Sequence, residues 1–188
     1  MEEIIKKAEE FALSEIEKYG LPLYLFDIAN KKGQELAKQL GADKELVLLG
    51  TWLMDVKLGE ATSKGLRDKH IEMSVQAAKE FLSPFNLDEE RVKKILNCVE
   101  GHHGTVSWIC KEAEIAANAD CYKFLPVMNW LKFLNRLGKR PTTFEEDLAY
   151  AEQKLEEKWK TLSLDVCKKE LEPQYKLIKQ LIEEVKKS

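Results

Sequence analysis

The sequence of 188 residues lacks a long apolar run and contains little glycine, proline and cysteine. Its longest apolar stretch runs from Leu46 to Met54 and is interrupted by Gly50 and Thr51, whereas a membrane-spanning helix needs about 20 apolar residues. Nine glycines and five prolines are too few for a collagen-like or low-complexity chain. The first segment, MEEIIKKAEE, has no apolar core of the signal-peptide kind. We therefore expect a soluble, cytoplasmic protein that does not bind membranes.

The cysteines form neither a CxxC pair nor a spacing typical of a zinc site. They are scattered along the chain at Cys98, Cys110, Cys121 and Cys167. Because buried free cysteines behave as small hydrophobic residues, we expect structural thiols and neither disulfides nor a nucleophile.

The charged residues show no excess of basic side chains. The chain has 30 basic and 33 acidic residues and a formal net charge of −3. This balance excludes a strongly basic nucleic-acid binder and argues against long nucleic acids as partners. Hydrophobic residues make up 44% of the chain, which is enough for a substantial core.

The apolar residues repeat with helical spacing along nearly the whole chain, and no window alternates convincingly with the period of a strand. We expect one all-α domain over residues 1–188, a bundle of about eight to nine helices. Its core motifs would lie in residues 23–125, with C-terminal helices from residues 126–188 packing on them. The expected helices are 2–19, 23–40, 44–55, 69–82, a helix capped by Asn86 that runs to Val99, 111–124, 128–137, 144–162 and a last one after Pro173.

Two further local features are expected from the pattern. The segment VKLGEATSKGLRDK, residues 56–69, is expected to be a loop. Thr143 and Glu146 have the spacing of a capping box for the helix that follows.

Two aspartates and three histidines carry the metal-binding chemistry suggested by the sequence. Asp55 ends the most hydrophobic predicted helix, where a buried carboxylate is costly unless a cation, a metal or several donors meet it. Asp120 shares a helix face with small alanines, which would let another element approach. His70, His102 and His103 are the only histidines, and each falls at the apolar edge of a predicted helix. Such oxygen and nitrogen donors suit Mn, Fe, Co, Ni, Zn or Mg. The alternative is that the histidines are hydrogen-bonded core residues and the aspartates are capping or solvated groups.

Four segments resemble motifs of the HD-domain superfamily of metal-dependent phosphohydrolases. The family's helix that ends in a His-Asp pair is similar to LGADKELVLLGTWLMDVKLGEA, with Asp55 as the aspartate. The next histidine helix resembles RDKHIEMSVQAAKEFL, with His70. The segment with the later histidines resembles KILNCVEGHHGT, with His102 and His103, and the final Ala-Asp motif resembles EAEIAANADCYKFL, with Asp120.

The resemblance covers about residues 23–125, and it departs from the family at two positions. Met54 stands in place of the histidine of the His-Asp pair, and the family's first histidine, expected near Leu25, is absent. Asp27 lies nearby, but two positions along a helix turn a side chain by about 200°. Of the four ligands of the metal site shared by most of the family, the chain keeps only Asp55 and Asp120.

The first hypothesis is a divergent phosphohydrolase that acts on a small phosphate ester or nucleotide. The resemblance implies one divalent metal ion at Asp55, His70 and a histidine of the 102–103 pair, with Asp120 near it. That ion would activate a water molecule, and Asp120 would orient the water or act as a general base. Basic residues of the adjacent loop would hold phosphate oxygens: Lys57, Lys64, Arg67 and Lys69.

The second hypothesis is a catalytically inactive HD-like domain that binds a ligand or a partner protein without a metal. Methionine and leucine fit a helical core, so the fold would survive the lost ligands. A third and weaker hypothesis is a helical interaction module, with the helix from Phe144 and the C-terminal helix as its partner surface. The sequence leaves open whether the chain forms a homo-oligomer.

Overall fold

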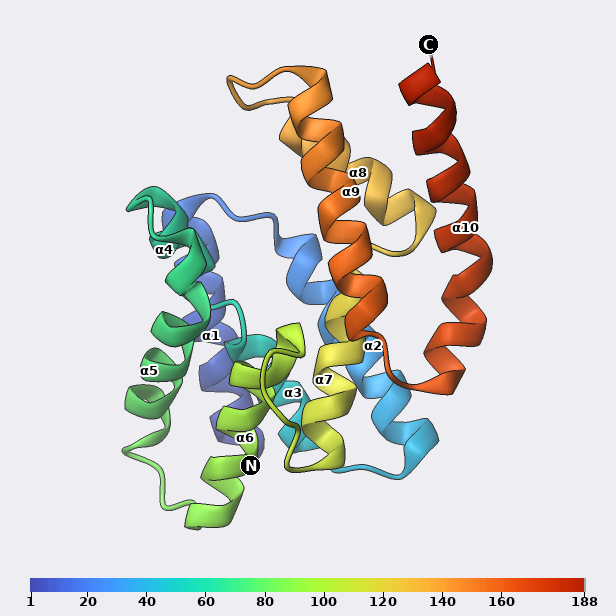
Figure 1. Ribbon diagram of the computed structural model, residues 1–188. Helices are drawn as coiled ribbons and strands as arrows, with labels where there is room; N and C mark the ends of the chain where they lie inside the picture. The colour runs from blue at the N-terminus through green and yellow to red at the C-terminus, as the bar shows by residue number, and fades with distance from the viewer. Residues whose placement is uncertain (188) are drawn as a thin grey trace. The chain divides into compact units, whose positions relative to one another are not determined.

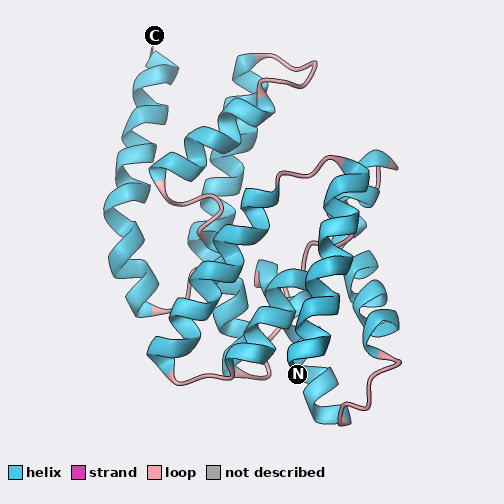
Figure 2. Cartoon of the chain, turned by 180° about the vertical axis from the view of Figure 1, so that it is seen from behind, coloured by secondary structure: helices cyan, strands magenta, loops and turns pink. Residues whose placement is uncertain are grey.

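Every regular element of the described residues, 1–187, is helical in the computed structural model (Figures 1 and 2). This confirms the all-α fold class. The chain divides into two compact units, Met1–Asp120 and Cys121–Ser188, and the expected single domain stays a prediction. None of the helices in the described part of the chain is both long and apolar enough to cross a bilayer.

The first unit contains the helices that carry the predicted site. They are α1 (Glu2–Tyr19), α2 (Leu23–Leu40), α3 (Lys44–Leu53), α4 (Leu58–Ser63), α5 (His70–Leu82), α6 (Glu89–Glu100) and α7 (Lys111–Cys121), which reaches the boundary of the unit. Two short 3-10 turns lie beside the histidines: η1 (Arg67–Lys69) precedes His70, and η2 (Gly101–His103) follows α6.

Helix α3 is the central element of the first unit because it is apolar on most of its surface. The Asp43 carboxylate caps it by accepting hydrogen bonds from the backbone N–H groups of Glu45 and Leu46 at 3.0 and 3.1 Å. Helices α1, α2, α5 and α6 all pack against α3. A glycine lets α6 approach closely, since a Cβ atom at Gly50 would lie 2.4 Å from the Cβ of Cys98.

The second unit contains α8 (Val127–Leu137), α9 (Phe144–Thr161) and α10 (Asp165–Lys187), which contact one another. The predicted capping box of α9 is confirmed: Thr143 Oγ1 accepts from the Glu146 N–H, and Glu146 accepts from the Thr143 N–H.

The segment predicted to be a loop contains α4 and η1. Helix α4 forms because Leu58, Gly59 and Ala61 are buried. A Cβ atom at Gly59 would lie 2.5 Å from the Cβ of Tyr19, so the glycine permits close packing against α1. Tertiary packing therefore outweighs the loop-like composition of this segment.

Four other helix limits differ from the predictions by two residues or more. Helix α3 ends at Leu53 and not at Asp55. Asp88, and not Asn86, caps α6, since its carboxylate accepts from the Arg91 N–H at 2.8 Å. Helix α7 ends at Cys121 and not near Phe124. Helix α10 begins at Asp165 and continues through Pro173. An interior proline costs a helix about 3 kcal/mol. In α10 one buried stripe continues on both sides of the proline: Cys167, Leu171, Ile178 and Ile182.

Candidate metal centre

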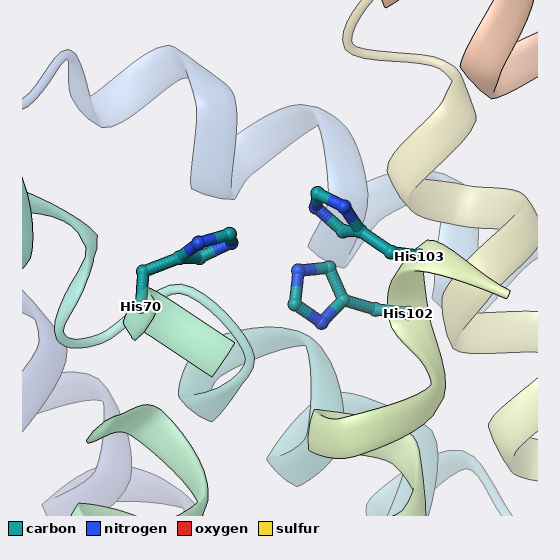
Figure 3. Close-up of side chains that lie close together, drawn as sticks. All are labelled: His70, His102 and His103. Atoms are coloured by element: carbon teal, nitrogen blue, oxygen red, sulfur yellow. The ribbon is translucent and has the colours of Figure 1, made fainter. Parts of the chain in front are cut away.

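Three helix ends bring the predicted ligands together. Asp55 lies in the turn that follows α3, because the helix ends at Leu53 and the Leu58 N–H closes the turn on the Asp55 carbonyl. His70 is the first residue of α5, and His102 and His103 belong to the η2 turn after α6. Since α3, α5 and α6 pack on one another, residues far apart in sequence meet. Figure 3 shows the three imidazole rings facing one another.

The donor atoms of this cluster are close enough to share one ion. One ring nitrogen from each of His70, His102 and His103 lies within 4.8 Å of the others. The Asp55 Oδ1 atom lies 3.6 Å from His70 Nε2 and 3.5 Å from His102 Nε2. Two donors that are each about 2.1 Å from one ion lie about 3 to 4 Å apart. The separations around Asp55 therefore fit ligands of a single divalent ion.

Backbone carbonyls fix the tautomers of two histidines. His70 Nδ1 lies 2.7 Å from the Arg67 carbonyl oxygen, and His102 Nδ1 lies 2.6 Å from the Val99 carbonyl oxygen. A carbonyl only accepts, so both Nδ1 atoms carry the proton and donate it. The lone pair of each neutral ring is then on Nε2, which faces Asp55. Metal-ligating histidines are commonly oriented in this way.

This arrangement places two hydrogen-bond acceptors opposite one another. With the proton on Nδ1, a neutral imidazole presents a lone pair at Nε2 to the carboxylate oxygen of Asp55. His102 Nε2 is buried and has no hydrogen-bond partner. An unpaired buried acceptor is costly, and a cation bound at His102 Nε2 would satisfy it. The donor set of the described residues thus fits a divalent metal.

The site is largely withdrawn from solvent. His102 is fully buried, His70 and Asp55 are nearly so, and His103 is partly exposed. Burial lowers the pKa of His70, while the nearby Asp55 carboxylate acts in the opposite direction. Burial therefore favours the neutral ring, which is the form that binds metals.

Asp120 is also buried, near the end of α7. It belongs to the same unit as the histidine cluster. Its place beside the cluster, and its role toward a water molecule, stay predictions.

The basic residues predicted to hold phosphate differ in their surroundings. Lys57 Nζ forms ion pairs with Glu15 at 2.9 Å and Glu60 at 3.0 Å. The Arg67 guanidinium lies 3.4 Å from Thr62 Oγ1, and both Arg67 and Lys69 are exposed. Lys57 would have to leave its carboxylates to reach a phosphate, whereas Arg67 and Lys69 are accessible from solvent.

The two positions that depart from the HD pattern are apolar and buried. Met54 is 0% exposed and Leu25 is 5% exposed, whereas Asp27 is exposed. The Asp27 carboxylate therefore does not take the buried place of Leu25. Sequence and structure agree that this chain lacks the imidazoles of those two positions.

Three groups that position the ligands were not predicted from the sequence. Two are the carbonyls of Arg67 and Val99, each three residues before a histidine. The third is buried Ser74, whose hydroxyl accepts a hydrogen bond from the Lys57 N–H at 3.1 Å and so ties the turn after Asp55 to α5. Only Ser74 left a signal in the sequence, because it lies one helical turn after His70.

Three solved structures are similar to this chain. A predicted HD superfamily hydrolase from an uncultured Thermotogales bacterium is 15% identical, with a TM-score of 0.65 over 96% of this chain and 90% of that one. An HD-superfamily hydrolase from Bacillus thuringiensis is 19% identical, with a TM-score of 0.69 over 99% and 96% of the two chains. A Lactobacillus plantarum protein is 16% identical, with a TM-score of 0.72 over 99% and 96%.

One curated protein matches in sequence, and no family model matches the chain. It is Ribonuclease Y of Finegoldia magna, which is 35% identical over 94 residues. The match covers 50% of this chain and 16% of the ribonuclease, so only a small part of that protein is comparable. The structural matches establish the fold alone, and this chain shares it with two proteins described as HD superfamily hydrolases.

Proposed function

Because the chain has the fold of the HD superfamily hydrolases, we propose that it is a metal-dependent phosphohydrolase. Its substrate would be a small phosphate ester or a nucleotide. The observation that carries the proposal is the pair of Nδ1-protonated imidazoles, His70 and His102, whose Nε2 atoms lie 3.6 and 3.5 Å from Asp55 Oδ1. This donor set is typical of a divalent metal site.

Asp55, His70 and His102 would hold one divalent ion, with His103 and Asp120 as the additional candidates. A bound ion of this kind supplies a Lewis acid for a phosphoryl oxygen and lowers the pKa of a water molecule. The carbonyls of Arg67 and Val99 keep the two Nε2 atoms aimed at the carboxylate before any ligand arrives. This preorganisation reduces the cost of binding.

Charge and exposure suggest the roles of the remaining predicted site residues. Asp120 would accept a hydrogen bond from the attacking water and take its proton. Arg67 and Lys69 would hold phosphate oxygens, and Arg67 can do so with two parallel hydrogen bonds. Lys57 would join them only if its pairs with Glu15 and Glu60 open.

The ribonuclease match supports a phosphate ester as the substrate class. That relative's name describes an enzyme of RNA, and its similarity to this chain covers 94 residues. The net charge of −3 does not favour a long polyanion. We therefore propose nucleotides and short phosphodiesters ahead of long RNA.

The first test is the metal content of the protein purified without chelator and without a histidine tag. Wild type, Asp55→Ala and Asp27→Ala would be compared by inductively coupled plasma mass spectrometry. Asp27 is an exposed aspartate of α2 and serves as the matched control. We expect about one equivalent of metal in wild type and in Asp27→Ala, and a loss in Asp55→Ala.

Hydrolysis of a panel of phosphomonoesters, nucleotides and dinucleotides is then measured with the metal found. Activity that disappears in Asp55→Ala and persists in Asp27→Ala would support the proposal. If the wild-type protein binds no Mn, Ni or Zn on reconstitution, the proposal of a metal-dependent enzyme is wrong.

The alternative is an inactive HD-like domain that binds a ligand or a partner protein. The burial of Leu25 and Met54 favours it, because these apolar residues replace two imidazoles of the family pattern. This alternative predicts a folded protein without stoichiometric metal and without hydrolysis of the panel.

A further inference from the structure

The second unit exposes an apolar surface on two of its helices. It consists of four large side chains, which we call the α8–α10 face: Met128 and Leu131 of α8, and Leu177 and Leu181 of α10. Their exposed fractions lie between 43 and 62%, so the rest of the described chain leaves them accessible to a partner. A single exposed apolar residue is ordinary, whereas a group of them on one surface is typical of an association site.

Helical spacing and one hydrogen bond bring these side chains together. The Val127 N–H donates to Gln174 Oε1 at 3.1 Å, which places the first turn of α8 beside the middle of α10. Leu177 lies three residues after Gln174, and Leu181 lies four residues after Leu177, so these side chains follow one another along one side of α10. Met128 follows Val127 directly. The α8–α10 face therefore continues from α10 onto the start of α8.

The other side of α10 is held firmly within the second unit. Trp159 of α9 stacks on Tyr175 with the ring centroids 4.4 Å apart, and Lys179 Nζ forms ion pairs with Glu152 at 3.1 Å and with Glu156 at 2.8 Å. Both views of the ribbon show α8 and α9 on one side of α10 (Figures 1 and 2). The helix therefore presents the α8–α10 face as a preformed surface, which reduces the cost of binding a partner.

The charges beside the two leucines of α10 have opposite signs. Lys176 precedes Leu177, and Glu183 follows Leu181 by two residues. Both charged side chains are exposed, and their separation of seven residues places them on the same side of the helix. Lys176 pairs with Glu172 of its own helix at 2.6 Å, an exposed contact that contributes little to stability. Lys176 can therefore exchange this contact for the carboxylate of a partner.

These charges distinguish two ways in which a second copy of the chain could cover the α8–α10 face. If two α10 helices packed in the same direction and in register, Lys176 would meet the partner's Lys176. If they packed in opposite directions about a two-fold axis, Leu177 would lie opposite the partner's Leu181, and Lys176 would lie beside the partner's Glu183. Both arrangements bury the leucines, but only the antiparallel one joins opposite charges.

We propose that the α8–α10 face binds a second copy of this chain, with the two α10 helices antiparallel about a two-fold axis. The choice of partner rests on the charges beside the face, which are complementary to themselves in this arrangement. Met128 and Leu131 would extend the apolar contact beyond the two helices. For the C-terminal helix, the proposal adds a partner and an orientation to the expected interaction surface. It does not depend on the proposed phosphohydrolase activity.

Sedimentation equilibrium of the untagged chain at increasing concentration measures this association. We expect a reversible equilibrium between monomer and dimer in wild type. Leu181→Glu should raise the dimer dissociation constant by about 100-fold or more, because it buries a carboxylate against the partner's Leu177. The matched control is Leu23→Glu on α2, since Leu23 is 42% exposed and Leu181 is 44% exposed. The proposal is wrong if wild type stays monomeric at its highest soluble concentration, or if both variants affect the dimer equally.

Exchanging the charges tests the antiparallel orientation at exposed positions. Lys176→Glu and Glu183→Lys should each weaken the dimer by about three- to tenfold, because each substitution brings like charges together twice. The variant that combines both substitutions should dimerise as strongly as wild type, since it restores both ion pairs in reverse. Circular dichroism checks that each variant is folded. Single variants that dimerise as tightly as wild type, or a combined variant as weak as the single ones, would contradict the antiparallel arrangement.

Discussion

The two nitrogen atoms of His102 have different partners, and this difference is the basis of the candidate metal centre. Nδ1 donates to the Val99 carbonyl, and Nε2 lies 3.5 Å from Asp55 Oδ1 without a hydrogen bond. His103 is a sequence neighbour but is partly exposed. The sequence could name the pair of histidines, but it could not distinguish them, because their relative burial depends on how η2 packs.

Replacing His102 should weaken metal binding more than replacing His103. Removal of residues that only orient a ligand costs about 10- to 100-fold in metal affinity, so we expect His102→Ala to cost about 100-fold or more. The control His103→Ala should cost less, since its ring is not fully enclosed. Isothermal titration calorimetry with Mn or Ni measures both. Equal losses would show that both rings contribute alike.

The ion pairs of Glu60 are expected to stabilise the protein at neutral pH and to lose this effect in acid. Hydrogen bonds from Lys64, at 2.5 Å, and from Lys57 lower the pKa of Glu60 to about 2 from its ordinary value of 4.5. A lowered folded-state pKa stabilises the fold above pH 4.5, and this contribution is lost as the pH falls from 4.5 toward 2. Because surface ion pairs are screened, Glu60→Gln should cost about 1 kcal/mol at pH 7.

Urea unfolding between pH 3 and pH 7 measures this effect. The difference between wild type and Glu60→Gln should shrink below pH 4.5. Glu10→Gln, at an exposed position of α1, is the control. A difference that does not vary with pH would contradict the ion-pair explanation.

At the scale of elements, the contact between α3 and α6 positions Asp55 relative to His102. This contact depends on Gly50, whose missing side chain leaves room for Cys98. Periodicity predicted α3 and α6 well, because their buried faces repeat in the sequence. It could not predict α4, whose formation depends on packing against α1, nor the continuation of α10 through Pro173.

Gly50→Ala should destabilise the protein by about 1 to 3 kcal/mol, because its Cβ would lie 2.4 Å from the Cβ of Cys98. The control is Gly138→Ala, whose Cβ would have its nearest contact at 3.8 Å. Gly138 has a φ of −61°, which alanine adopts readily, so this change should be close to neutral. Chemical denaturation measures both variants. Equal destabilisation would mean that α3 and α6 can move apart at Gly50 with little loss of stability.

At the scale of the whole molecule, the predicted metal ligands all belong to the first compact unit, while α8, α9 and α10 form the second. A ligand that binds only the folded state stabilises it by about 2.7 kcal/mol at 100 times its dissociation constant. This stabilisation acts first on the part of the chain that holds the ligand.

Metal at 100 times its dissociation constant should therefore increase amide protection most strongly in α3, α5 and α6. Native-state hydrogen exchange measures this protection. Asp55→Ala should show no increase. An equal increase in α8, α9 and α10 would show that the two units unfold together. No increase in either unit of the wild type would contradict the metal site.

The sequence by itself determined the helical class of the chain and most of its helices, because helical periodicity and capping are local properties. It also identified the residues Asp55, His70, His102 and His103, since these side chains are difficult to explain by packing alone. Only the tertiary structure decided which ring nitrogens face Asp55 and which of His102 and His103 is fully buried. Those relations depend on contacts between helices distant in sequence and on backbone carbonyls, whose positions no side-chain pattern encodes.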